Sequence, residues 1–239
     1  MENKEIRWQC ISGSVLKLIA MAAMLVDHVA YFLLQENLHF VTPLFTVGTK
    51  GITLYYIFRT IGRIAFPMYC FLLTEGFVHT KNRKRYGTNL LLFALISELP
   101  WNFLHSGSLF YGGQNVFFTL FLGFCGLYVI EYLCNRPALE ASALIGLLLF
   151  AYLFKADYGM LGFAAIVAMY VLREKAAIRA VVCTCIFNSH LRAGVAFVPI
   201  SLYNGKRGFI RGKVGKYICY AFYPTHMIIL AVLKFYILK

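Results

Sequence analysis

The chain has 239 residues, 60% of them hydrophobic and 14% charged, and a formal net charge of +13. A soluble domain is typically about 45–50% apolar and about 25% charged. The composition therefore argues against a soluble globular core and predicts a single integral membrane domain over residues 1–239. The basic residues cluster in short loops between apolar runs, as cytoplasmic loops do under the positive-inside rule. Either topology alone accounts for the charge, or some of these loops also hold an anionic cytosolic ligand. In both cases we expect no nucleic acid partner.

Apolar runs follow one another along the chain, and several are long enough to cross a bilayer, which needs about 20 apolar residues. They cover residues 14–34, 54–79, 86–104, 115–134, 138–154, 158–172, 178–203 and 217–238. The expected fold class is all-α, a polytopic helical bundle with about eight membrane segments. Pro67 is expected to kink the second run, because its ring removes a backbone hydrogen bond.

Three basic loops, at residues 81–85, 173–179 and 204–216, are expected on the cytoplasmic side. The run 178–203 conflicts with this arrangement, since a single crossing there would place the third loop outside. The same run is polar at its middle, from Asn188 to Arg192. We therefore expect a broken segment or a hairpin of two short helices, which membranes tolerate only where it is buried in protein or lines a cavity.

Asp27 and His28 lie inside the first apolar run. A charged residue at that depth costs about 2.5–3.5 kcal/mol on insertion scales and is functional by default. Neighbouring residues on a helix point about 100° apart, so the two side chains need different partners. One interpretation makes His28 a general base facing a cavity, because histidine titrates near working pH, and pairs Asp27 with a cation on another helix, for example Arg63. The alternative is a structural ion pair beside a hydrogen-bonded histidine.

Two pairs of polar residues in the second run are four residues apart and so share a helix face: Arg59 with Arg63, and Glu75 with His79. Buried guanidinium groups bind carboxylate or phosphate through two hydrogen bonds. Each pair is explained either by local structure or by a polar track that runs from the basic loop 81–85 toward the membrane centre.

A compact basic turn, Asn204-Gly205-Lys206-Arg207-Gly208, stands before the last run. Its glycines let the backbone approach a ligand, and its cations suit phosphate, although basic loops beside a membrane are ordinary. His226 follows Pro224, so that a kink would aim it inward. The cysteines show no CxxC or Cys/His ligand spacing, which predicts neither disulfides nor a metal site. These residues alone leave an acyl-transfer enzyme and an ion or solute transporter both open.

The chain also resembles the TraX family of bacterial membrane proteins. The resemblance rests on an ordered set of stretches that covers almost the whole chain: LKLIAMAAMLVDH (16–28), RTIGRIAFPMYCFLLTEGFVHT (59–80), NRKRY (82–86), LLFALISELPWN (91–102), NVFFTLFLG (115–123), ADYGMLG (156–162), LYNGKRG (202–208) and KYICYAFYPTHMIIL (216–230). Residues 35–53 and 135–153 carry little of it.

This resemblance implies a multi-span acetyltransferase in the bacterial inner membrane. It would move an acetyl group from cytosolic acetyl-CoA to an amine or hydroxyl of a membrane or envelope acceptor, such as a pilin-like N-terminus, a glycan or a lipid. A transporter and a non-enzymatic assembly protein remain the alternatives. The residue matching the histidine central to such enzymes is His28. The expected catalytic residues are His28, Asp27 and Arg63; the expected acetyl-CoA contacts are Glu75, His79, Arg83, Lys84, Asn204, Lys206, Arg207 and His226.

Overall fold

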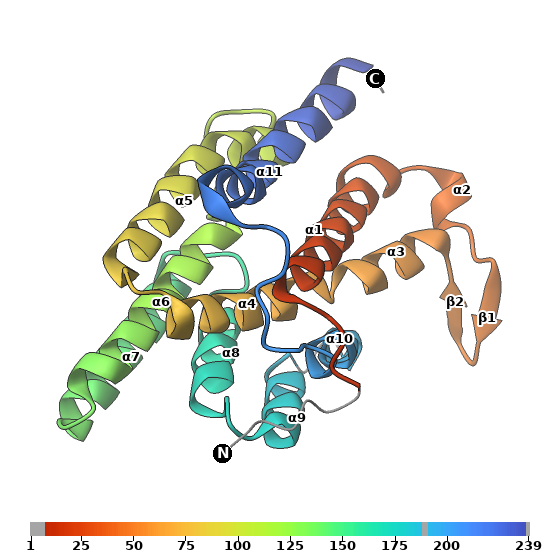
Figure 1. Ribbon diagram of the computed structural model, residues 1–239. Coiled ribbons are helices and arrows are strands. Elements are labelled where there is room, and N and C mark those ends of the chain that lie inside the picture. Colours follow the sequence, from red (N-terminus) through yellow and green to blue (C-terminus); the bar gives the residue numbers. More distant parts are fainter. Residues whose placement is uncertain (1–7, 188–190, 238–239) are drawn as a thin grey trace. The chain divides into compact units, whose positions relative to one another are not determined.

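The structure is a computed structural model that describes residues 8–187 and 191–237 (Figure 1). It contains two compact units. Unit 1 comprises Met1–Tyr69 and His190–Lys239, and unit 2 comprises Cys70–Ser189. A single domain over residues 1–239 stays a prediction.

Unit 1 is built around α1 (Gly13–Val29), which packs against α3 (Leu54–Gly62) and α11 (Gly212–Val232). The π-helical turns η1 (Ala30–Leu34) and η3 (Leu233–Ile237) extend α1 and α11. The smaller elements are α2 (Leu38–Val41), the 3₁₀ helix η2 (Leu191–Ala196) and α10 (Phe197–Ser201). An antiparallel hairpin of β1 (Phe45–Val47) and β2 (Lys50–Ile52) lies in a region that the sequence left without a prediction.

The regular secondary structure in the described part of unit 2 consists of helices joined by short loops. The chain enters it through α4 (Ala65–His79) and continues as α5 (Arg83–Ser106), α6 (Val116–Leu133), α7 (Pro137–Leu153), α8 (Gly159–Val171) and α9 (Ala176–Ile186). Helix α6 contacts α5, α7 and α8, and α8 also contacts α9. Close packing of α6 on α8 depends on glycine, since a Cβ at Gly126 would lie 2.9 Å from the Phe163 ring.

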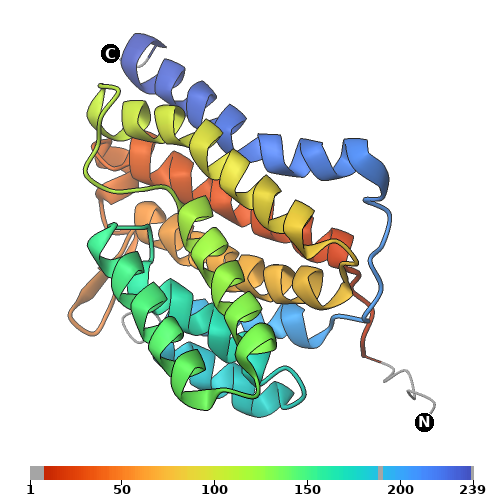
Figure 2. The same ribbon diagram turned by 90° about the vertical axis from the view of Figure 1, so that its left-hand side faces the viewer.

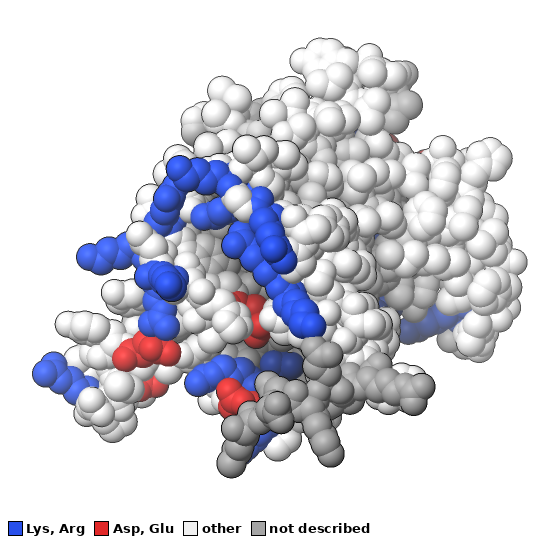
Figure 3. Space-filling view, in the orientation of Figure 1, with Lys and Arg blue, Asp and Glu red and all other residues white. Residues whose placement is uncertain are grey.

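Four helices are long and apolar enough to cross a membrane: residues 13–34, 54–79, 116–133 and 212–237. These match four of the predicted runs, and they identify a membrane protein. Helix α5 has the length of a span, but its polar residues keep it out of this set. Helices α7, α8 and α9 are apolar and shorter. The all-α class is confirmed, whereas eight crossings remain a prediction. Figure 3 shows wide uncharged surfaces beside the clustered Lys and Arg side chains, as expected for helices that face lipid.

Two predicted irregularities are present. The run 54–79 is interrupted at residues 63–64, between α3 and α4. Pro67 lies in the first turn of α4 and has no N–H to donate to the carbonyl of residue 63, which explains a break one turn before the proline. The run 178–203 is also discontinuous, because α9 ends at Ile186 and α10 begins at Phe197. Residues 188–190, on which the expected hairpin depends, lie outside the described part of the chain.

Candidate functional site: a histidine pair and an ion pair on helix α1

Asp27 and His28 have separate partners, as the helical geometry predicts. The carboxylate Oδ2 of Asp27 accepts a hydrogen bond from Nη1 of Arg59 at 2.7 Å, which joins α1 to α3. The two side chains are only 14% and 17% exposed. The guanidinium of Arg59 also lies over the Tyr31 ring, 4.8 Å from its centroid. Charge pairing and the cation–π contact together offset the cost of these charges at membrane depth.

The expected pairing of Asp27 with Arg63 is wrong, and the reason is steric. Gly62 lies directly against the Asp27 side chain, and a Cβ there would overlap it. Arg59 precedes Gly62 by three residues and so shares its helix face, which brings Arg59 to the carboxylate. Arg63 ends α3 and interacts with Asp27 only through longer-range electrostatics.

His28 forms a pair with His226, a residue 198 positions away in the sequence. Nδ1 of His28 lies 2.7 Å from Nε2 of His226, and the two rings stack with 6° between their planes and 5.0 Å between centroids. Nδ1 of His226 lies 2.8 Å from the carbonyl oxygen of Phe222, one turn earlier in α11. His226 is buried, at 4% exposure, whereas His28 is half-buried.

The hydrogen-bond partners fix the protonation of the two rings when both are neutral. A carbonyl oxygen only accepts, so Nδ1 of His226 carries its proton and donates to Phe222. Nε2 of His226 is then an acceptor, and Nδ1 of His28 must be the donor to it. It follows that Nε2 of neutral His28 carries a lone pair. The hydrogen-bonded series from the Phe222 carbonyl through His226 to His28 thus sets the tautomer and the plane of the half-buried His28 imidazole.

Aromatic side chains hold the histidine pair in place. The Tyr223 ring contacts both imidazoles edge-on, and Phe222 stacks on His226 with centroids 4.9 Å apart. Pro224 lies inside α11 and removes one backbone hydrogen bond, and Figure 2 shows that α11 bends along its length. The inward position expected for His226 is therefore observed, and its immediate partner is His28.

The basic turn at residues 204–208 is bound to the first turn of α1. The backbone N–H groups of Gly13 and Ser14 donate to the carbonyls of Lys206 and Arg207, each at 2.9 Å. The hydroxyl of buried Ser14 donates to the Arg207 carbonyl at 2.8 Å. Because the carbonyls cap α1, the side chains of Lys206 and Arg207 remain exposed around the N-terminus of the helix.

Lys17 is a functional candidate that the sequence reasoning did not single out. It interacts electrostatically with Arg207 and so extends the basic turn into α1. It is also on the helix face of His28, eleven residues earlier, which corresponds to about 16 Å along the axis. The shared face was the available signal. Thus Asn204, Lys206, Arg207, Lys17 and His28 all belong to unit 1.

The other expected acetyl-CoA contacts lie in unit 2. Glu75 and His79 form the local pair that their spacing predicts, with 3.4 Å between Oε2 and Nε2. Arg83 donates to Glu131 of α6 at 3.2 Å, and Lys84 is exposed beside it. The part of the chain that the structure describes contains no group of three His, Cys, Asp or Glu side chains placed to hold a metal ion.

Fold and site together define an α-helical membrane protein whose first spanning helix carries one histidine of a pair and one member of a half-buried ion pair. The family model described as "TraX protein" matches residues 12–234. The chain belongs to the TraX family. A curated relative, the "Probable fimbrial assembly protein FimC, serogroup H1" of Dichelobacter nodosus, is 29% identical over 256 aligned positions, which cover 95% of this chain and 97% of the relative. No solved structure matches the chain.

Proposed function

We propose that the protein is a multi-pass enzyme of the bacterial inner membrane that transfers an acetyl group from cytosolic acetyl-CoA to an amine or hydroxyl of an envelope acceptor. The observation that carries this proposal is the hydrogen-bonded pair of His28 and His226. A half-buried imidazole with a fixed tautomer, placed among apolar helices, is suited to general-base catalysis.

In the proposed reaction, Nε2 of His28 takes a proton from the acceptor while the acceptor nitrogen or oxygen attacks the thioester carbonyl. His28 then carries a positive charge, and its Nδ1–H donates to the neutral Nε2 of His226, a hydrogen bond that strengthens with the charge. Collapse of the tetrahedral intermediate breaks the carbon–sulfur bond, and His28 returns its proton to the departing thiolate of CoA. His226 acts here as a positioning residue, in place of the cofactor contact expected from the sequence.

The basic turn and Lys17 are the proposed binding residues for the phosphates of CoA. Three cations, Lys17, Lys206 and Arg207, come together at the N-terminus of α1, where the helix dipole also favours anions. An extended thioester arm bound along α1 would span the roughly 16 Å from Lys17 to His28. Arg63 is the proposed donor to the oxyanion, because Asp27 is already paired with Arg59. Contacts from Glu75, His79, Arg83 and Lys84 stay predictions.

The relative's description as a fimbrial assembly protein points to a fimbrial subunit as the acceptor. The N-terminal amine of such a subunit is an acceptor of the chemical class that the proposed base would deprotonate. Glycan and lipid hydroxyls of the envelope belong to the same reaction class and are the competing acceptors.

The proposal is tested with purified protein in detergent, acetyl-CoA labelled in the acetyl group, and peptides with a free or a blocked N-terminus. We expect label on the peptide with a free N-terminus and none on the peptide with a blocked one. His28→Ala should lower the rate of transfer at least 100-fold, the range for general-base catalysis. His39→Ala is the control, since His39 is exposed on the short helix α2 and is not part of the pair. Equal transfer by wild type and His28→Ala would refute the proposal.

A transporter is the second candidate, and the discontinuity between α9 and α10 favours it. Transporters bind ions or solutes where spanning helices are broken. Helix α9 ends at Ile186, and the later part of the same apolar run forms the short helices η2 and α10. Reconstituted vesicles distinguish the two functions. Solute flux without any acyl-CoA would support the transporter, whereas label transfer without flux would support the enzyme.

A further inference from the structure

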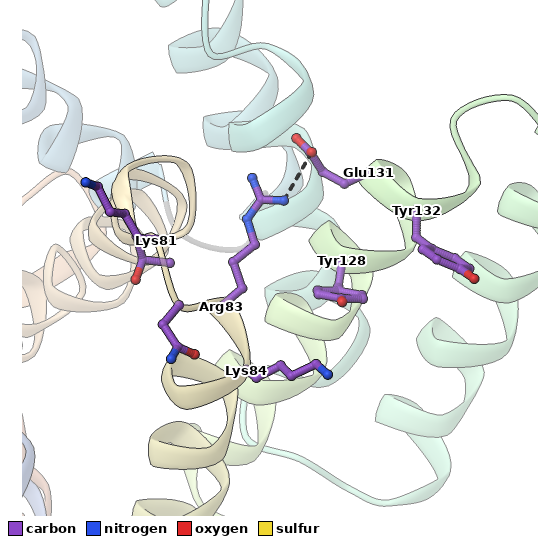
Figure 4. Close-up of a pocket in the computed structure, with 8 residues that line it drawn as sticks. Lys81, Arg83, Lys84, Tyr128, Glu131 and Tyr132 are labelled. Carbon is purple, nitrogen blue, oxygen red and sulfur yellow. Dashed lines mark hydrogen bonds and ion pairs between the residues drawn. The ribbon is translucent and has the colours of Figure 1, made fainter.

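Unit 2 has a pocket of about 520 Å³ at the junction of α5 and α6 (Figure 4). One wall is the segment that leads into α5, and the other is the last part of α6. The lining residues are Thr80, Lys81, Asn82, Arg83, Lys84, Tyr128, Glu131 and Tyr132. Three of them are cationic and one is a carboxylate, which leaves an excess of two positive charges.

Arg83 is held rigidly in this pocket. Its guanidinium donates to Glu131 at 3.2 Å and lies 4.2 Å from the centroid of the Phe77 ring. Glu131 is fixed in turn, because the Tyr170 hydroxyl donates to its other oxygen. In Figure 4, Arg83 points to Glu131, Lys84 extends toward Tyr128, and Lys81 points away from both. Lys84 makes no ion pair with any residue in 8–187 or 191–237.

The pocket lies where a spanning helix ends. Helix α6 is one of the four candidate spans, and its last turn supplies Glu131 and Tyr132. Tyr128 and Tyr132 are 41% and 77% exposed. Exposed tyrosines at the end of a span mark the level of the lipid headgroups. The first turn of α5, capped by Asn82, adds its helix dipole at the same place.

We propose that this pocket binds the phosphate of an anionic phospholipid headgroup. Basic pockets at the cytoplasmic ends of membrane helices recognise such headgroups, and an excess of positive charge suits a phosphodiester, which carries one negative charge. The Glu131 carboxylate in the lining disfavours a ligand as highly charged as a CoA nucleotide. Arg83 supplies fixed geometry, and Lys84 supplies the uncompensated charge. For Arg83 and Lys84, this proposal takes the place of the acetyl-CoA contacts expected from the sequence. It does not depend on the reaction proposed for His28.

The test measures lipid binding to the full-length protein in neutral detergent by native mass spectrometry. The probes are phosphatidylglycerol and the zwitterionic phosphatidylcholine. We expect phosphatidylglycerol to bind more tightly, and Lys84→Gln to weaken it about fivefold, the effect of one cation near a membrane surface. Arg85→Gln is the matched control, because Arg85 is the exposed neighbour of Lys84 and is absent from the pocket lining. It removes the same charge from the same helical turn and should change binding less than twofold.

A second arm uses adenosine 3′,5′-bisphosphate as the soluble source of phosphate. The proposal predicts that Lys84→Gln leaves binding of this nucleotide unchanged. Nucleotide binding that Lys84→Gln abolishes, with no effect on phosphatidylglycerol, would overturn it and assign the pocket to the free nucleotide. Equal loss of lipid binding in Lys84→Gln and Arg85→Gln would also overturn it, because the effect would then be general electrostatics.

Discussion

Replacement of His226 separates positioning of His28 from binding of acetyl-CoA. His226→Ala removes the acceptor of the His28 Nδ1–H, which lies 2.7 Å away. When His28 is charged in the transition state, that hydrogen bond contributes about 1.5–3 kcal/mol, and each 1.36 kcal/mol is tenfold in rate. We therefore expect kcat to fall roughly ten- to one-hundred-fold, while KM for acetyl-CoA changes little.

His226→Gln provides the matched comparison, because its amide oxygen still accepts the His28 N–H and should restore most of the lost kcat. The assay is steady-state acetyl transfer with acetyl-CoA varied at saturating acceptor. A raised KM with unchanged kcat, in either variant, would refute positioning and return His226 to the role of a cofactor contact. Equal activity of the Ala and Gln variants would show that the hydrogen bond has no part in the reaction.

Three further sets of substitutions test the packing around α1, with Gly146 of α7 as a control position. Gly62→Ala places a Cβ against Asp27 and should lower the free energy of unfolding by about 1–3 kcal/mol. At Gly146, a Cβ would meet nothing within 4 Å, so Gly146→Ala should raise the free energy of unfolding by about 0.5–1 kcal/mol. Thermal unfolding in detergent measures both effects. Asp27→Ala and Arg59→Ala should each lower the free energy of unfolding by about 3 kcal/mol. The double variant should lose about 1–3 kcal/mol less than the sum of the two single losses. Losses that add up fully would contradict the ion pair. Gly208→Ala places a Cβ 2.8 Å from the Cβ of Ser14, at a residue whose φ is +85°. The resulting strain of about 1–3 kcal/mol should displace the basic turn and raise KM for acetyl-CoA. An unchanged KM would show that the basic turn does not bind acetyl-CoA.

The sequence predicts the helices of this protein better than the contacts between them. Hydropathy located all four long apolar helices, and the angle between neighbouring residues correctly gave Asp27 and His28 separate partners. The sequence could not decide whether Arg59 or Arg63 pairs with Asp27, since the two arginines share a helix face. The choice was made by Gly62, whose missing side chain sets how closely α1 approaches α3, and such an approach is a tertiary property.

The pairing of His28 with His226 could not be predicted from the sequence either, because it is also a tertiary contact. The two residues are separated by 198 positions, and no local spacing rule connects them. Only the proline in α11 gave a signal, because a bend there turns His226 inward. The hairpin of β1 and β2 was missed because residues 35–53 are neither strongly apolar nor periodic. The predicted run 86–104 became helix α5, whose polar residues leave it outside the four helices that are apolar enough to cross a membrane.

The histidine pair allows a last prediction, because single and double substitutions in it should affect stability differently. Removal of one partner leaves a buried polar group unsatisfied, which costs about 1–3 kcal/mol, whereas replacement of both by apolar groups of similar shape is nearly neutral or stabilising. His28→Ala leaves the buried Nε2 of His226 without its donor and should lower the melting temperature. The double variant His28→Phe/His226→Leu should melt at or above the wild-type temperature and yet transfer no acetyl group. A fall of several degrees in the double variant would mean that the imidazoles are retained for folding, and the catalytic interpretation of the pair would lose its physical basis.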